Sequence, residues 1–233
     1  MRIDCFPFFN EISLLKARLL WLSPHVDLFI ISELDHTYSG YPKPYYLDQM
    51  DLPSNVIRLR LKDPFYEATP WQREHLQRDL LSEVIPPGKH LIHHSDVDEF
   101  PHPQVFSLNI DHPFHLQEEL YYYNIYTRLH HFWNLPFICT ELIKPSYMRH
   151  EPYPTIQDAG WHFSWFGTDL QIISKMKAFS HQELNTLEAQ QRIVLREPLD
   201  PWDRPIPFER LREPTIPVGL RTVLRENSLG ELL

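Results

Sequence analysis

The chain has 233 residues, of which 42% are hydrophobic and 23% are charged, which predicts one folded domain with a sizeable core. The formal net charge of −9 argues against a nucleic-acid partner, because binding to a phosphate backbone requires a basic surface. Two cysteines are too few for a disulfide framework, and neither a signal peptide nor an apolar run long enough for a membrane span is present, so we expect a cytoplasmic protein.

The first part of the chain predicts strands that alternate with helices. Residues 2–9 and 26–33 are short apolar runs, typical of buried parallel strands. Between them, apolar residues recur at helical spacing from Ile12 to Leu22, and Asn10 is placed to cap this helix. Residues 56–61 alternate in hydropathy and predict a third strand.

A polar loop follows the second strand. Glu33 ends that strand and Lys43 lies in the loop, at the edge where α/β sheets bind their ligands. An ordinary surface loop with one lysine is the alternative, and the residues alone leave both open.

The next helix begins with a clear start signal. Thr69-Pro70-Trp71-Gln72 combines a capping box with proline at the first helical position, and Leu76, Leu80 and Val84 form the expected buried stripe. Glu74 and Arg78 are four residues apart and can pair on the surface. Alternatively, Arg73 or Arg78 turns toward ligand phosphates, which suit the guanidinium group.

The fourth predicted strand covers residues 91–95, and an acidic motif directly follows it. Asp96, Asp98 and Glu99 stand where a strand of an α/β sheet ends, and Mg²⁺ and Mn²⁺ prefer oxygen ligands. We therefore expect Asp96 and Asp98 to hold a metal ion that neutralises a diphosphate. Because such a short motif is weak evidence, a solvated acidic turn is the alternative. No glycine-rich phosphate loop accompanies the strands, so metal and side chains would have to hold the diphosphate.

The order of elements up to this motif favours an α/β fold with a mostly parallel central sheet flanked by helices. The aromatic-rich segment at residues 112–143 predicts two or three further strands or a β-rich meander. Its rings either pack in the core or stack on sugars.

Two further segments contain candidate functional residues. Residues 160–167 alternate like a strand and place His162 on one face, and Thr168 opens a capped helix. His181 and Glu183 lie at a helix junction, where they are either a metal ligand and a base or a hydrogen-bonded pair.

The end of the chain is rich in proline. Six prolines between residues 198 and 217 predict an extended segment, and a short amphipathic helix follows. We expect a domain at residues 1–197 and an extension at residues 198–233 that packs on it.

Several segments resemble glycosyltransferase family 17, which includes a β-1,4-mannosyl-glycoprotein N-acetylglucosaminyltransferase. They are, in the order of that family, DCFPFFNEISLLKARL, VDLFIISELDHTYSGYPKPYY, REHLQRD, SDVDEFP, and GWHFSWFG with KMKAFSHQE. Each motif alone is weak, but their shared order over residues 2–185 is specific.

The resemblance implies a GT-A-like sandwich that moves a sugar, expected to be N-acetylglucosamine, from a UDP-sugar to a carbohydrate or glycolipid acceptor with inversion. It implies a Mn²⁺ or Mg²⁺ ion whose expected ligands are Asp98, Asp96, His181 and His162. The residues expected to bind the donor are Asp96, Glu33, Arg73, Arg78, Asp79 and Lys43. Glu183 is the first choice for the base and Asp169 the second.

Two other classes of protein stay open at this point. One is a binding protein for nucleotide sugars or carbohydrates that has lost turnover. The other is a metal-dependent phosphohydrolase, which would need a second cluster of metal ligands.

Overall fold

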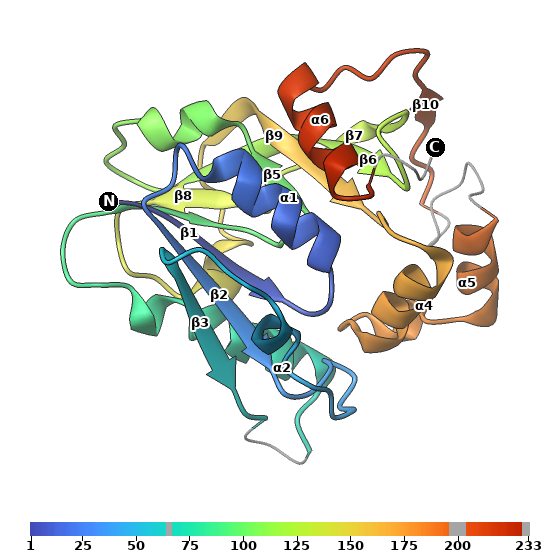
Figure 1. Cartoon of the computed structure of the whole chain (residues 1–233), viewed down its shortest axis with the longest axis horizontal. Helices are drawn as coiled ribbons and strands as arrows, with labels where there is room; N and C mark the ends of the chain where they lie inside the picture. The colour runs from blue at the N-terminus through green and yellow to red at the C-terminus, as the bar shows by residue number, and fades with distance from the viewer. Residues whose placement is uncertain (64–66, 196–203, 230–233) are drawn as a thin grey trace.

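The computed structural model describes residues 1–63, 67–195 and 204–229, and this part forms a mixed sheet with helices on both faces (Figure 1). The strands are β1 (Arg2–Phe8), β2 (Leu28–Leu34), β3 (Val56–Leu61), β4 (Leu91–His94), β5 (Glu99–Pro101), β6 (Phe114–Tyr122), β7 (Thr127–Trp133), β8 (Phe137–Cys139), β9 (Thr155–Ser164) and β10 (Phe208–Arg210). The α-helices are α1 (Ile12–Leu22), α2 (Pro70–Asp79), α3 (Pro145–Met148), α4 (Asp169–Ala178), α5 (Leu187–Val194) and α6 (Val218–Glu226). Short 3₁₀ turns lie at Tyr46–Gln49, Ser82–Val84, Pro103–Ser107 and Gln182–Leu184.

The first half of the sheet is parallel. β1 pairs in parallel with β2 on one side and β4 on the other, and β2 pairs in parallel with β3. α1 connects β1 to β2, and α2 lies between β3 and β4 in the chain. The carboxyl ends of these strands therefore share one edge, which is where α/β sheets bind ligands.

The second half of the sheet corrects the prediction of a mostly parallel sheet. β8 joins the two halves by antiparallel pairing with β4 and with β6, and β6–β7, β7–β10 and β5–β9 are also antiparallel. Only β6 and β9 pair in parallel in this half of the described structure. The reason is connection length: residues 123–126 join β6 to β7, and a parallel pair would need a crossover of a dozen residues or more.

Buried side chains of β1 and β2 alternate between two faces of the sheet. The apolar cluster on the α1 face includes Phe6, Phe29, Leu15 and Leu19. The cluster on the opposite face, against the ends of α2 and α3, includes Ile3, Cys5, Ile30, Leu81 and Met148.

Two of the three helix starts for which the sequence predicts a cap are confirmed. The capping boxes predicted at Thr69 and Thr168 are both formed. α1, however, begins at Ile12 without a side-chain cap, so the prediction that Asn10 caps it is wrong.

The buried face of α2 is polar, which corrects the predicted stripe of Leu76, Leu80 and Val84. The buried residues of this helix are Arg73, Gln77 and Arg78. Gln77 explains part of this face, because its amide donates hydrogen bonds to the carbonyl oxygens of Phe8 and Ser32. α2 therefore satisfies backbone groups at the ends of β1 and β2 instead of filling an apolar core.

The C-terminal segment packs on the rest of the described chain. β10 pairs with β7, and α6 lies beside α1, where Leu220 and Leu224 join Leu14 and Ala17 in one apolar cluster (Figure 1). The predicted domain boundary at residue 197 falls in residues 196–203, outside the described residues.

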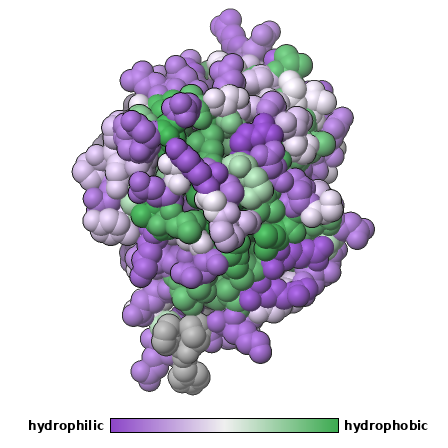
Figure 2. Space-filling view, turned by 90° about the vertical axis from the view of Figure 1, so that its left-hand side faces the viewer, coloured by the Kyte–Doolittle hydropathy of each residue, from purple (hydrophilic) through white to green (hydrophobic). Residues whose placement is uncertain are grey.

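None of the described helices is both long enough and apolar enough to cross a membrane. Hydrophilic side chains cover most of the face at the left of Figure 1, and apolar side chains are exposed between them (Figure 2). Folded proteins normally expose apolar atoms over about half of their surface, so we assign no function to these exposed apolar side chains.

We expect Gly160→Ala to lower the free energy of unfolding by about 1–3 kcal/mol, the usual cost of overpacking. Gly160 lies where β9 pairs with β5, and an added Cβ would clash with the carbonyl oxygen of Phe100 and lie 2.8 Å from Glu118 Oε1. Urea unfolding measures the change. Gly219→Ala is the control, because its Cβ would meet only Trp21 at 3.4 Å and alanine is favoured in a helix. Equal losses in the two variants would contradict the prediction.

Candidate functional site

A pocket of about 690 Å³ opens at the sheet edge where β1, β2 and β4 end. This volume is in the range of roughly 300–1,000 Å³ that small-molecule sites occupy. The basic side chains in its described lining are Lys43, Arg78, Arg149, Lys175 and Arg204, and the acidic ones are Glu11, Glu74, Asp96 and Asp98. The described lining thus contains five basic and four acidic side chains, in a chain whose net charge is −9.

Below the pocket, a buried ion pair joins α1 to β1. The Arg18 guanidinium, which is 0% exposed, donates hydrogen bonds of 2.7 and 2.9 Å to the two carboxylate oxygens of Asp4. His93 Nδ1 of β4 lies 2.8 Å from Asp4 Oδ1. Burial by itself would raise the pKa of Asp4, but Arg18 and His93 lower it to about 2, so Asp4 is ionised at neutral pH.

The same guanidinium holds the acidic loop after β4. Arg18 donates to the carbonyl oxygen of Asp96 at 2.9 Å, to the carbonyl oxygen of Glu99, and to Ser95 Oγ at 2.7 Å. Because the donors of a guanidinium form a rigid fork, these bonds fix the loop relative to α1 and β1. The position of the Asp96 and Asp98 side chains therefore depends on a residue outside the motif.

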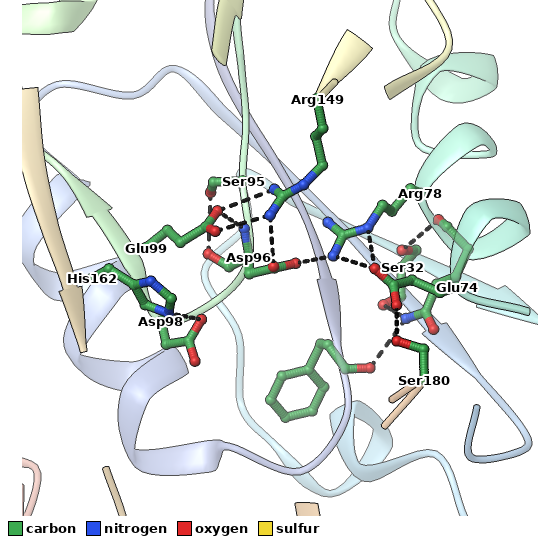
Figure 3. Close-up of polar contacts among 12 residues, drawn as sticks. Ser32, Glu74, Arg78, Ser95, Asp96, Asp98, Glu99, Arg149, His162 and Ser180 are labelled. Atoms are coloured by element: carbon green, nitrogen blue, oxygen red, sulfur yellow. Dashed lines mark hydrogen bonds and ion pairs between the residues drawn. The ribbon is translucent and has the colours of Figure 1, made fainter. Parts of the chain in front are cut away.

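Two arginines hold the carboxylate of Asp96 (Figure 3). Arg78 Nη2 lies 2.6 Å from Asp96 Oδ1, and Arg149 Nη2 lies 3.1 Å from Oδ2. Burial alone would raise the pKa of Asp96, but the two guanidinium groups lower it below its usual value. Arg78 also pairs with Glu74 at 2.8 Å, and Arg149 pairs with Glu99 at 3.0 Å. The expected pairing of Glu74 with Arg78 thus exists, but it lies in the pocket and not on the surface.

Asp98 faces a lysine and a histidine. Lys175 Nζ of α4 lies 2.7 Å from Asp98 Oδ2 and 3.4 Å from Glu11 Oε1, and His162 Nε2 of β9 lies 3.7 Å from Asp98 Oδ1. The Asp98 side chain is only 6% exposed. Burial would raise its pKa, but Lys175 and His162 hold the pKa of Asp98 well below its usual range.

The side chains at the acidic motif do not fit a resident divalent cation in this arrangement. Arg78 and Arg149 occupy both oxygens of Asp96, and Lys175 occupies one oxygen of Asp98. Across the described residues, no group of three or more His, Cys, Asp or Glu side chains is arranged to hold a metal ion. The Mn²⁺ or Mg²⁺ ion expected from the sequence stays a prediction.

Among the residues expected to bind a donor, Asp96, Arg78 and Lys43 line the pocket. Glu33 is fully buried beneath its loop, where it accepts hydrogen bonds from Lys43 Nζ at 2.6 Å and from the backbone N–H groups of Tyr46 and Leu47. Glu33 therefore fastens the loop that carries Lys43.

Arg73 and Asp79 are outside the described pocket lining, and each supports a neighbouring segment. Arg73 Nε donates to Asp63 at 2.7 Å, and its guanidinium also reaches the carbonyl oxygen of Tyr38. Asp79 accepts hydrogen bonds from the backbone N–H and the hydroxyl of Ser146 in α3, the helix that ends next to Arg149. Asp79 thus helps to place Arg149.

The two expected bases lie apart from the acidic loop. His181 lines the pocket, but neither Glu183 nor Asp169 belongs to its described lining. Glu183 Oε1 lies 2.7 Å from His181 Nδ1, and this hydrogen bond lowers the pKa of Glu183. His181 packs edge-on against Trp71, with ring centroids 4.5 Å apart. Asp169 is exposed in the first turn of α4.

Sequence reasoning missed Arg18, Arg149 and Lys175. Arg18 lies three residues after Leu15 and four before Leu22, on the same buried face of its helix. This helical spacing could have predicted from the sequence that Arg18 is buried. Lys175 likewise lies three residues after the buried Ile172. Arg149 follows a helix of four residues and has no comparable signal.

A model of glycosyltransferase family 17 matches residues 2–194 of the chain. The matched range contains the acidic loop and the pocket-lining residues named above except Arg204. No curated protein matches the chain.

We expect Asp4→Asn to lower the free energy of unfolding by about 3–5 kcal/mol, because it leaves the buried Arg18 without its counter-ion. Chemical unfolding at neutral pH measures the loss. Asp27→Asn is the control, since the Arg2–Asp27 pair is 39% exposed on each side and should contribute no more than about 1 kcal/mol. Equal losses would contradict the role of the buried pair.

The same pair predicts a pH dependence. The folded pKa of Asp4, about 2, is below its usual value of 3.8, so the stabilisation is present above about pH 4 and is lost as the pH falls toward 2. The stability difference between the wild type and Asp4→Asn should therefore shrink in this window. A difference that stays constant from pH 6 to pH 2 would contradict it.

Proposed function

The chain belongs to glycosyltransferase family 17, and from this membership we propose that it moves a sugar from a UDP-sugar to a hydroxyl group of a carbohydrate or glycolipid. N-acetylglucosamine is the sugar that we expect it to transfer. The parallel strands β1, β2 and β4 end at one edge of the sheet, and the acidic loop follows β4 there, which supports a GT-A type of fold for this activity.

One observation supports a donor diphosphate at this place more than any other: Arg78, Arg149 and Lys175 converge on the loop that contains Asp96 and Asp98. Arginine and lysine side chains suit phosphate oxygens, the first as a planar fork and the second as a point charge. Each of these cations is anchored by an acidic partner, so its position is fixed before a ligand arrives. Fixed charges stabilise a developing negative charge without reorganisation.

The proposed reaction breaks the bond between the anomeric carbon and the diphosphate oxygen, and the diphosphate leaves with the electron pair. The acceptor hydroxyl forms the new bond from the opposite face, which inverts the anomeric configuration. The arginine and lysine groups stabilise the charge on the leaving diphosphate. A base takes the hydroxyl proton, and Glu183, which contacts the pocket through His181, stays the first choice.

Aromatic side chains of the lining support a sugar at the pocket. Trp71 lines the pocket and is partly exposed. Trp133 also lines the pocket and packs against His162 with ring centroids 4.7 Å apart. Aromatic rings with polar tips combine an apolar face for a sugar ring with nearby hydrogen-bonding groups. We place the acceptor on the Trp71 and His181 side, away from the acidic loop.

Arg78→Gln should weaken transfer from UDP-N-acetylglucosamine to oligosaccharide acceptors by about 10-fold or more in kcat/KM, the value of a lost charged hydrogen bond. Mass spectrometry and the anomeric proton coupling identify the product. Arg192→Gln is the matched control, because Arg192 also pairs with a glutamate four residues away but lies on α5, outside the described lining. Release of free sugar without an acceptor would indicate a hydrolase instead, and UDP binding without transfer would indicate a binding protein.

Glu183→Gln should lower kcat by about 10²–10⁴, the usual contribution of a general base, with little change in UDP affinity. Turnover is measured at saturating donor, and UDP affinity by calorimetry. Asp169→Asn serves as the comparison, because Asp169 is the second candidate. If only Asp169→Asn lowers kcat, the base is Asp169, and if UDP affinity alone falls in Glu183→Gln, Glu183 is not the base.

A further inference from the structure

Lys175 Nζ occupies one carboxylate oxygen of Asp98, at a distance of 2.7 Å. From this geometry, and on the basis of the proposed function, we propose that Lys175 and its neighbouring arginines bind the donor diphosphate without a divalent metal ion. The acidic loop then serves to position these cationic side chains and not to coordinate a metal.

The first support is the anchoring of Lys175. Its ammonium lies 2.7 Å from Asp98 Oδ2 and 3.4 Å from Glu11 Oε1, and its side chain is 26% exposed in the pocket. α4, which carries it, begins with a complete capping box at Thr168 and buries Ile172 and Met176. The lysine therefore extends from a well-anchored helix and not from a loop.

The second support is the occupancy of the carboxylate oxygens at the motif. Arg78 and Arg149 each contact one oxygen of Asp96, and Lys175 contacts one oxygen of Asp98. A divalent cation on Asp98 would have to displace the ammonium of Lys175 or lie next to it, and like charges at contact distance repel. Asp98 and Glu11 raise the pKa of Lys175 although burial opposes them, so the ammonium stays charged.

The third support is hydrogen-bonding capacity. An ammonium has three N–H donors, and two acidic side chains face it. The third donor is left for a phosphate oxygen in the pocket. In this role Lys175 forms and breaks no covalent bond. The anomeric carbon–oxygen bond breaks, and the electron pair stays on the diphosphate that Lys175, Arg78 and Arg149 contact.

A purely structural role is the competing explanation, in which the Lys175–Asp98 pair only attaches α4 to the acidic loop. The two roles differ in what depends on the lysine charge. A structural pair affects unfolding, whereas a phosphate-binding lysine affects the affinity for a diphosphate in a protein that is still folded.

Calorimetry of UDP and of inorganic pyrophosphate, in EDTA and separately with Mn²⁺, tests the proposal. We expect the wild type to bind UDP in EDTA with an affinity within about threefold of that in Mn²⁺. Lys175→Met should lose at least about tenfold in EDTA for both ligands, whereas Lys175→Arg should keep most of the affinity. Lys177→Met is the matched control, because Lys177 is an exposed lysine on the same helix. Thermal unfolding of each variant verifies that it is folded.

The outcomes separate this inference from the proposed function. UDP binding by the wild type only in the presence of Mn²⁺ would overturn the inference and leave the transferase proposal intact. Unchanged affinity in folded Lys175→Met would also overturn it. Absence of UDP binding in both EDTA and Mn²⁺ would contradict the proposed donor, and it would also contradict the inference that the diphosphate binds without a metal ion.

Discussion

The fully buried guanidinium of Arg18 is the interaction on which the candidate site depends. It joins α1, β1 and the loop after β4 through Asp4, Ser95 and backbone carbonyl oxygens of the loop. A buried charge is costly unless it is paired and hydrogen-bonded. The loop conformation that satisfies Arg18 is therefore also the one that aims Asp96 and Asp98 into the pocket.

The side chains of that loop reach three different parts of the chain. Asp96 contacts Arg78 from α2 and Arg149 from the end of α3 (Figure 3). Asp98 contacts Lys175 from α4. Through these contacts, the loop orients cationic side chains from three helical segments toward the pocket. A net charge of −9 does not by itself exclude an anionic ligand, because five basic side chains line the pocket.

The sequence predicted those features that local chemistry determines. The capping boxes at Thr69 and Thr168 depend on residues three apart, and both are formed. The strand before Asp96 and its parallel neighbours follow from short apolar runs. The strands predicted in residues 112–143 are present as β6, β7 and β8. Their antiparallel pairing was not predicted, because the pairing of β8 with β4 and β6 is a long-range event with no local pattern.

The candidate site was predicted only in part, for a related reason. Six of the residues that the sequence analysis named line one pocket, and their roles there stay predictions: Asp96, Asp98, Arg78, Lys43, His162 and His181. Arg149 and Lys175 were missed because each is a cation without a motif, and its role exists only once distant elements pack together. The polar buried face of α2 was missed because helical spacing reports apolar residues, whereas Gln77 and Arg78 are buried through their hydrogen bonds and ion pairs.

The central claim is that fixed cationic side chains around the acidic loop bind the donor diphosphate. A crystal structure of the protein with UDP, grown in EDTA, tests this most directly. We predict the diphosphate within hydrogen-bond distance of Lys175 and of at least one of Arg78 and Arg149, with Asp98 still paired to Lys175. A diphosphate bound away from the acidic loop, or Lys175 turned out of the pocket, would contradict the account.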